Sequence, residues 1–428
     1  MAMGAERRQV DVVIGQQALP LGRLGWLRQG GREFSTLAYA PSWLSSPERF
    51  EVSPDLPLTG GHQVRRAPTR EDSVFHHALA DTEPDAWGRR VIARAHARSR
   101  QRDPSIGPLT AFDTLAAVDD YCRVGALRLR DDEGQFLGSF EGGAGRTPPL
   151  IELAKLYEAT RAVEAGSDSA ADLRYLQGRG TSLGGQRPKC SVIDHDGALA
   201  IGKFPSQHDQ RPVERAEVLT LRLATLAGIE TAPARIEVVQ GTAVAVIRRF
   251  DRAAGESRIP YLSAASMLQA RRDEDRSYFE LADALRARGA QPGPDLAQLW
   301  RRLVFNLLVT NVDDHLQNTG FLHVGRGLWR LAPAFDLNPF PDKLRESKTW
   351  LGEALGPITS VEMLLGHADY FGLDAAAARQ VLSAVAGAVR RWRSVGRRKG
   401  VGLTPRQLDE IAPAFEHAQA KAAASALA

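Results

Sequence analysis

The hydrophobic pattern of this chain changes near residue 250, and this change constrains the fold more than any other feature. Before that point, short alternating segments separated by Gly-rich turns are typical of β-strands. These segments span residues 10–15, 21–40, 190–194, 198–204, 236–239 and 244–248. After about residue 260 the apolar residues recur at helical spacing. A β-rich front half before a helical back half predicts an α+β fold with two lobes.

Two turns and several helical segments refine this prediction. An Asp-Gly step at 196–197 and a Gln-Gly step at 240–241 each indicate a hairpin. Between them, a helix closed by a Gly cap is predicted over residues 214–228. The other predicted helices span residues 68–100, 150–165, 275–289, 295–310, 360–366, 373–394 and 404–425. Trp300 and Trp329 are expected in the core.

The 428 residues exceed one ordinary core and suit two or three packed parts. Residues 138–149 are rich in Gly and Pro and predict a linker. We therefore expect an N-terminal subdomain over 1–140, a β-rich lobe with a Gly-rich loop and a hinge over 150–250, and a helical lobe with the catalytic loop over 251–428.

Composition excludes several classes of protein. With 43% hydrophobic and 25% charged residues, the chain is an ordinary globular sequence. It has neither an apolar run of the roughly 18–20 residues that span a bilayer nor an N-terminal signal core. Its two cysteines, Cys122 and Cys190, fit a reducing compartment, so a cytoplasmic location is expected. A net charge of +4 alone does not indicate nucleic-acid binding.

The strongest candidate site is a polar loop that follows an apolar helix. Asp313 precedes Asn318 by five residues, and Asp336 follows after a predicted hairpin. Protein-kinase-like phosphotransferases use this arrangement: the first Asp accepts the proton of the attacking hydroxyl, and the Asn and later Asp hold Mg²⁺ against ATP. A helix-ending polar loop is common, but this spacing is much rarer. His315 is expected to be a positioning residue rather than a metal ligand, and Asp314 a turn residue.

A Gly-rich loop and a strand lysine precede that site in kinase order. Residues 180–185 lie before a strand, where backbone amides suit an anion, although a Gly-rich loop alone is usually a connection. Lys203 lies on the second strand of the following hairpin, where kinases carry a phosphate-pairing lysine. Its apolar neighbours disfavour a merely solvated lysine. Either Glu214 or Glu217 could pair with Lys203 from the next helix.

Two basic segments admit functional interpretations. Residues 248–252 end the last strand of the front half, where a kinase chain offers backbone groups to adenine; a charged strand end is the simpler alternative. Near the C-terminus lies a basic run made of Arg390, Arg391, Arg397, Arg398 and Lys399. The default interpretation of this run is a solvated basic face, and the more specific functional interpretation is contact with DNA phosphates.

Taken together, five segments resemble the HipA family of serine/threonine protein kinases, the toxins of bacterial type II toxin–antitoxin pairs. They are 84–90, 182–189, 249–252, 311–318 and 335–337. These segments are similar to the family's LPD-x-WG-RR segment, S-x-x-G-x-Q-x-K loop, RFDR hinge, N-x-DDH-x-x-N catalytic loop and YD-[VL] metal motif. The resemblance covers most of the chain.

The resemblance implies a role for each matching residue. Asp313 would be the catalytic base, with His315 beside it, and Asn318 and Asp336 would bind Mg²⁺. The implied ATP-binding residues are Ser182, Leu183, Gly184, Gly185, Lys189, Lys203, Arg248, Phe250 and His315. Ser182 would also be the inactivating autophosphorylation site. A HipB-like helix-turn-helix antitoxin, operator DNA reached through it, and a protein substrate are the implied partners; family substrates include aminoacyl-tRNA synthetases.

Two departures from the family pattern accompany the resemblance. Arg248 stands where the better-known toxin carries Glu, which is harmless if the hinge acts through its backbone. Gln317 stands where that toxin carries Lys, which could alter the phosphate environment or the protein substrate. Two other functions also fit the sequence. One is a catalytically weak corepressor bound to DNA beside an antitoxin, and the other is a small-molecule kinase with the same ATP machinery.

Overall fold

The computed structural model describes residues 5–69, 71–138, 147–176, 185–272 and 274–426. Within it the chain forms two compact units. Unit 1 contains residues 1–202, 251–273 and 322–327, and unit 2 contains residues 203–250, 274–321 and 328–428. Ser182, Leu183 and Gly184 lie outside the described residues, as does most of the predicted linker at 138–149.

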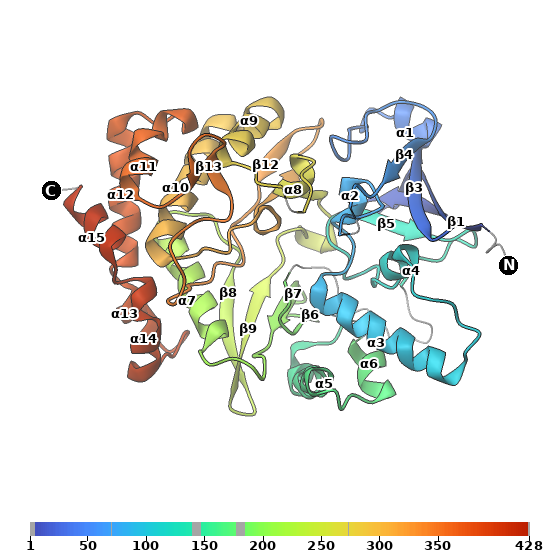
Figure 1. The fold of residues 1–428 in the computed structure, drawn as a ribbon, viewed down its shortest axis with the longest axis horizontal. Helices are drawn as coiled ribbons and strands as arrows, with labels where there is room; N and C mark the ends of the chain where they lie inside the picture. The colour runs from blue at the N-terminus through green and yellow to red at the C-terminus, as the bar shows by residue number, and fades with distance from the viewer. Residues whose placement is uncertain (1–4, 70, 139–146, 177–184, 273, 427–428) are drawn as a thin grey trace. The chain divides into compact units, whose positions relative to one another are not determined.

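Unit 1 is built on a five-stranded sheet, which carries the blue strands of Figure 1. Its order is β4-β3-β2-β1-β5, and neighbouring strands are antiparallel. The strands are β1 (Glu6–Ile14), β2 (Leu19–Gln29), β3 (Arg32–Tyr39), β4 (Gln63–Arg66) and β5 (Leu127–Arg130). Leu24, Trp26 and Leu37 are buried on one face, so the alternation in the sequence sets the register.

The helices of unit 1 correct one prediction. The continuous helix expected over 68–100 is wrong, because only a short α2 (His77–Ala80) and α3 (Ala86–Arg102) form there. Asp55 holds the turn before α2, since its carboxylate bonds both the ring of His76 and the amide of His77. Helix α3 begins only after Asp85, whose carboxylate accepts the amide of Gly88 at 2.7 Å as an N-cap.

The remaining elements of unit 1 follow the sequence more closely. The predicted helix at 150–165 is confirmed as η2 (Leu150–Glu152) and α5 (Leu153–Ala165). The predicted strands around Gly197 are β6 (Lys189–Ile193) and β7 (Leu199–Lys203), whose last residue already belongs to unit 2. The others are α1 (Pro41–Ser45), α4 (Ala111–Ala116), α6 (Ala170–Leu176), η3 (Ala254–Glu256), β10 (Tyr261–Ser263) and α8 (Ala264–Met267).

Unit 2 opens with a helix and a hairpin, both predicted. Helix α7 (Val213–Leu226) is followed by Gly228 in a left-handed conformation, with φ of 75°. Strands β8 (Ala234–Val239) and β9 (Thr242–Arg248) pair antiparallel through a two-residue turn. Gln240 and Gly241 both have positive φ there, as the common two-residue hairpin turn requires.

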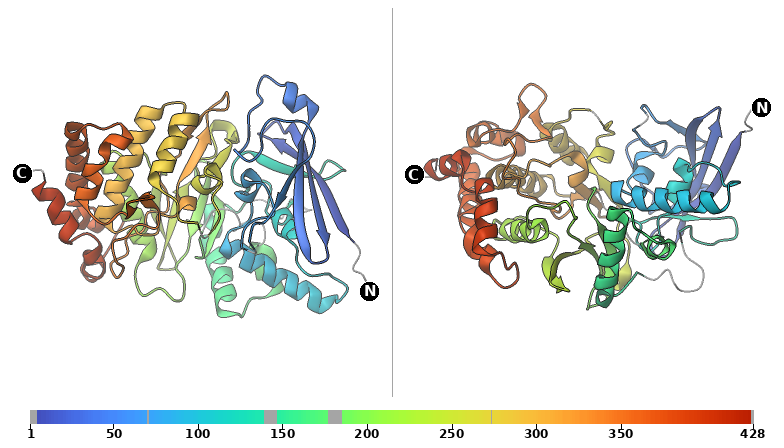
Figure 2. Two further views of the ribbon diagram at one scale, coloured as in Figure 1. Left: turned by 45° about the horizontal axis from the view of Figure 1, so that its top comes forward. Right: turned by 60° about the horizontal axis from the view of Figure 1, so that its bottom comes forward.

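The rest of unit 2 is mainly helical, with α10 packed against α12 (Figure 2). Its helices are α9 (Tyr278–Arg288), α10 (Pro292–Val309), η4 (Leu316–Asn318), α11 (Val361–Gly366), η5 (Ala368–Phe371), α12 (Ala375–Val389), α13 (Trp392–Arg397), α14 (Pro405–Ile411), η6 (Ala412–Ala414) and α15 (Ala418–Ser425). Its short strands are β12 (Trp329–Leu331), β13 (Trp350–Gly352) and β14 (Gly356–Pro357), and β11 (Gly320–His323) spans the unit boundary.

Two long helices predicted in the back half are each divided. The segment 373–394 breaks at Arg390 and Arg391, and the segment 404–425 breaks at η6, where Pro413 cannot donate a helical hydrogen bond. Trp300 and Trp329 are buried, as expected. Throughout the described residues, no helix combines the length and apolar character needed to cross a membrane.

Candidate active site

The candidate catalytic loop in unit 2 begins at a strained residue. The C-cap of α10 is Thr310, which adopts a left-handed conformation with φ of 52°, and this conformation is unfavourable for a β-branched residue. The Thr310 hydroxyl donates to the carbonyl of Ala414 at 2.9 Å and accepts a bond from Arg345 at 3.2 Å. The carbonyl of Thr310 also accepts the amide of Phe340 at 3.0 Å. These bonds hold the loop entrance in its strained geometry.

Asp313 and Asn318 close the loop that follows. The side-chain amide nitrogen of Asn318 donates to the backbone carbonyl of Asp313 at 2.8 Å. The oxygen of the same amide remains as its acceptor atom, the type of atom that ligates Mg²⁺. The Asp313 carboxylate reaches solvent, as a base that meets a substrate hydroxyl must.

Asp336 lies in the same unit and is joined to this loop through Asn338. Its Oδ1 accepts hydrogen bonds from Lys203 at 2.7 Å and from the side chain of Asn338 at 2.9 Å. The backbone amide of Asn338 in turn donates to the side-chain oxygen of Asn311 at 3.2 Å. Asp336 has a φ of 53°, an uncommon conformation that Asp tolerates better than most residues.

Lys203 bridges two acidic side chains. Besides Asp336, its ammonium donates to Glu217 on α7 at 2.6 Å. The sequence left Glu214 and Glu217 open as partners, and this contact selects Glu217. Burial alone would lower the pKa of Lys203, but the Asp336 and Glu217 carboxylates raise it, so the ammonium stays charged.

Asp314 was expected to be a turn residue, but its side chain also holds neighbouring segments together. Its buried carboxylate accepts the hydroxyl of Tyr278 at 2.6 Å and the amide of Lys348 at 2.7 Å. Its backbone carbonyl accepts the hydroxyl of Thr349 at 2.7 Å. Burial raises the pKa of Asp314 to about 6. Asp314 therefore fixes the segment around Lys348 onto the candidate catalytic loop.

His315 is half-buried beside Asp313, and burial lowers its pKa, so the ring is neutral near pH 7. Its Nδ1 is buried without a hydrogen-bond partner among the described residues.

The described residues contain no group of three or more His, Cys, Asp or Glu able to hold a metal. The carboxylate of Asp336 and the amide oxygen of Asn318 are nevertheless hard oxygen ligands that fit Mg²⁺.

Sequence reasoning missed Lys348. Its ammonium forms an ion pair with the Asp313 carboxylate. Lys348 lies 35 residues after Asp313 and belongs to none of the quoted motifs, so only a folded chain reveals the contact.

In unit 1, two segments distant in sequence meet near the end of the Gly-rich loop. The Lys189 ammonium lies 2.9 Å from the carboxylate of Asp85, the N-cap of α3. The carbonyl of Gly185 accepts the amide of Trp87 at 3.4 Å. These contacts link residues 84–90 with the described part of residues 182–189; contact of Lys189 and Gly185 with ATP stays a prediction.

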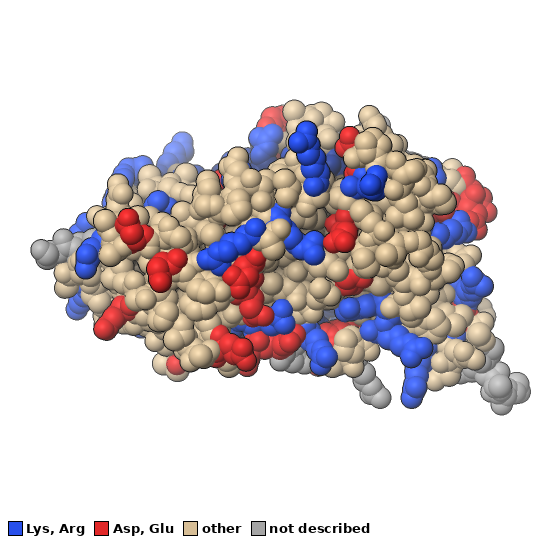
Figure 3. Space-filling model, turned by 90° about the horizontal axis from the view of Figure 1, so that it is seen from above, with Lys and Arg blue, Asp and Glu red and all other residues tan. Residues whose placement is uncertain are grey.

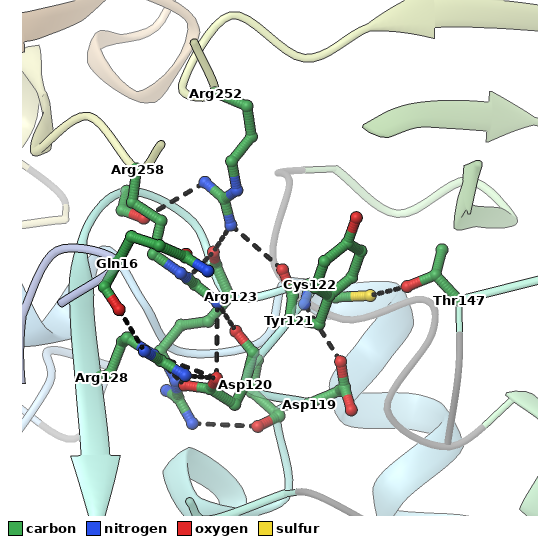
Figure 4. Close-up of polar contacts among 12 residues, drawn as sticks. Gln16, Asp119, Asp120, Tyr121, Cys122, Arg123, Arg128, Thr147, Arg252 and Arg258 are labelled. Atoms are coloured by element: carbon green, nitrogen blue, oxygen red, sulfur yellow. Dashed lines mark hydrogen bonds and ion pairs between the residues drawn. The ribbon is translucent and has the colours of Figure 1, made fainter. Parts of the chain in front are cut away.

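The hinge segment divides between the two units. In unit 2, Arg248 is exposed at the end of β9, and the Phe250 ring lies 5.3 Å from that of Phe335. In unit 1, the Arg252 guanidinium donates to the carbonyls of Tyr121 at 3.1 Å and Arg123 at 2.8 Å (Figure 4). The Asp251 carboxylate accepts the amide of Gly125 at 2.7 Å, so the Asp251 and Arg252 side chains anchor residues 121–125, a role that sequence reasoning missed. Adenine contact by Arg248 and Phe250 stays a prediction.

The fold and the site together define a protein of the kinase-like α+β class. The sequence matches the HipA N-terminal domain over residues 16–130 and the HipA-like C-terminal domain over residues 181–393. The chain belongs to the HipA family.

Two similar proteins extend this comparison. The putative kinase Y4mE of Sinorhizobium fredii is 24% identical over 331 residues, which cover 70% of this chain and 71% of that protein. Among solved structures, HipA of Shewanella oneidensis, in a complex with HipB and operator DNA, aligns with a TM-score of 0.67 at 19% identity. That alignment covers 97% of each chain and shows that the two proteins share a fold.

Proposed function

We propose that this protein is an ATP- and Mg²⁺-dependent serine/threonine protein kinase that acts as the toxin of a HipBA-like toxin–antitoxin system. The observation that carries the proposal is the bridge from Lys203 to both Glu217 and Asp336, in the same unit as Asp313 and Asn318. The lysine–glutamate pair and the metal-binding Asp are the parts that protein kinases need in place together.

Each residue has a part in direct phosphoryl transfer. Asp313 would accept the proton of the substrate hydroxyl, Asn318 and Asp336 would hold Mg²⁺, and Lys203 would bind phosphate oxygens. Bound Mg²⁺ would neutralise charge on the phosphates. Arg248 and Phe250 would offer backbone groups to adenine, and contact of Lys189 and Gly185 with ATP belongs to the same proposal. A cellular protein, with aminoacyl-tRNA synthetases as first candidates, receives the phosphoryl group, and phosphorylation of Ser182 silences the enzyme.

Autophosphorylation separates this function from a small-molecule kinase. After incubation with Mg·ATP, the purified protein should gain the mass of one phosphoryl group on the peptide that contains Ser182. The Ser182→Ala variant should not gain this mass there. If wild type hydrolyses ATP but its Ser182 peptide stays unmodified, the regulatory part of the proposal is wrong. A small-molecule kinase would then be the better-supported function.

A second function, DNA-bound corepression beside a HipB-like antitoxin, is favoured by exposure of the basic run. Arg390, Arg391, Arg397, Arg398 and Lys399 are all exposed, whereas the neighbouring Arg393 is paired with Glu416 and Asp409. On the face drawn in Figure 3, basic and acidic side chains are interspersed. The solved HipA–HipB–operator complex supplies the assembly to test.

Replacing the five basic residues by Ala should weaken operator binding by the complex and reduce its salt dependence. Each lost phosphate contact should make the negative slope of log K against log salt shallower by roughly 0.9. Binding titrations at several salt concentrations measure both quantities, with the exposed Arg379 on α12 replaced by Ala as the control. An unchanged slope in the five-residue variant would remove direct DNA contact from the proposal.

A further inference from the structure

The candidate catalytic loop, residues 311–319, carries neither lysine nor arginine, and its Gln317 is neutral and exposed. Phosphoryl transfer depends on cations that meet charge developing on the transferring group. Because Gln317 is neutral, a side-chain cation for the transferring group would have to come from outside this loop.

Lys203 alone does not supply this cation, because it is already shared. Its ammonium lies between Glu217 and Asp336, at 2.6 and 2.7 Å, so one positive charge faces two carboxylates. Its side chain is only 12% exposed. It is thus held at the metal-binding Asp336 rather than directed toward Asp313.

Lys348 combines a fixed backbone with a movable side chain. Its amide is bonded to Asp314, and the hydroxyl of its neighbour Thr349 is bonded to the Asp314 carbonyl. On the other side, the Ser347 hydroxyl donates to the carbonyl of Thr349 at 2.6 Å. The Lys348 side chain, in contrast, is 52% exposed and reaches the 35% exposed carboxylate of Asp313.

We propose that Lys348 is a further catalytic residue of the proposed kinase, whose ammonium moves from Asp313 to the transferring phosphoryl group. A lysine suits this movement, since it is a compact charge on a flexible stem. The substrate hydroxyl oxygen forms a bond to the γ-phosphorus while the bond to the ADP oxygen breaks, and the hydroxyl proton passes to Asp313. Lys348 keeps its proton throughout. Its departure also frees the Asp313 oxygen that must receive the substrate proton.

The inference rests on the proposed function, and a transition-state analogue tests it without relying on turnover. For Lys348→Ala, binding of Mg·ADP should stay within about twofold of wild type, while binding of Mg·ADP with aluminium fluoride should weaken about 100-fold, the scale of one lost donor. Calorimetric titration measures both affinities. The rate of ATP hydrolysis should fall by a similar factor, with an unchanged KM for ATP.

Two variants separate this role from a structural one. Lys348→Arg keeps the charge and should recover a large part of the lost affinity for the analogue. Lys343→Ala removes another exposed lysine of the same segment, which lies over the Phe340 ring at 4.5 Å, and should behave as wild type. Because Lys348 is half exposed, its truncation should leave the melting temperature unchanged.

The outcomes distinguish the inference from the function beneath it. If wild type binds the analogue tightly and Lys348→Ala binds it equally well, the role proposed for Lys348 is wrong. The proposed kinase function would not be affected by that result. A faster Lys348→Ala would identify the ion pair with Asp313 as inhibitory, which also overturns the inference. If wild type neither hydrolyses ATP nor prefers the analogue to ADP, the proposed kinase itself is wrong.

Discussion

Replacing Asp313 by Asn should lower the rate of phosphoryl transfer by about 100-fold or more, the scale of a lost general base. Asn has nearly the same shape as Asp but cannot accept the proton of a substrate hydroxyl. The bond from Asn318 goes to the backbone carbonyl of Asp313, so the substitution leaves that contact in place. The expected loss is therefore in the chemical step and not in the loop's geometry.

Transfer of labelled phosphate from ATP onto the protein itself measures this effect. Mg·ATP affinity, measured in parallel, should change little, because Asp313 is assigned to the substrate hydroxyl rather than to nucleotide. The exposed Asp369, replaced by Asn, is a matched control for the loss of a carboxylate from unit 2. Self-labelling of Asp313→Asn at the normal rate would show that another group acts as base.

The sequence predicted the parts of the candidate site that depend on local spacing. The five-residue step from Asp313 to Asn318 is a property of one short loop, and the bond between them needs no distant partner. Asp336 and Lys203 were chosen by their order along the chain, and the fold brings their side chains to 2.7 Å. Their chemical roles stay predictions.

Contacts made across long separations in sequence were not predictable. Lys348 on Asp313 and Tyr278 on Asp314 each join residues about 35 positions apart, and neither Lys nor Tyr has a distinctive local pattern. Glu214 and Glu217 are both buried in the first turns of α7, so sequence alone could not choose between them. Only the position of the Lys203 ammonium does so.

A similar limit explains the errors in the fold. The hairpin at Gln240-Gly241 was predictable because its turn is encoded by two adjacent residues. The segment 68–100 was not, because the ring of His76 is held by Asp55, 21 residues earlier, which sets the turn before α2. Tertiary contacts of this kind override a local helical pattern.

Replacing Lys203 by Met should destabilise the protein and abolish phosphoryl transfer together. Glu217 is 2% exposed, and without Lys203 its carboxylate would lie buried near that of Asp336 with no cation between them. Removing one partner of a buried ion pair costs about 3–5 kcal/mol. Urea denaturation should show a lower midpoint for the variant than for wild type.

The pH dependence of that loss identifies its cause. Burial already raises the pKa of Glu217 above its ordinary value of 4.5, and loss of Lys203 should raise it further. A carboxyl whose pKa is raised by folding stabilises the fold fully below its unfolded pKa, and this stability is lost as pH rises through the folded pKa. The deficit of Lys203→Met should therefore shrink toward pH 4.5 and be largest above neutrality.

A double variant separates stability from catalysis at the same bridge. Lys203→Met with Glu217→Gln removes the buried uncompensated charge, so most of the lost stability at pH 8 should return. Phosphoryl transfer should not return, because no ammonium faces the phosphates beside Asp336. Equal destabilisation at pH 5 and pH 8, without recovery in the double variant, would mean that the packing of the Lys203 stem matters more than its charge. Recovery of stability alone would show that the charges at Lys203 and Glu217 are held together for function, since the fold tolerates the loss of both.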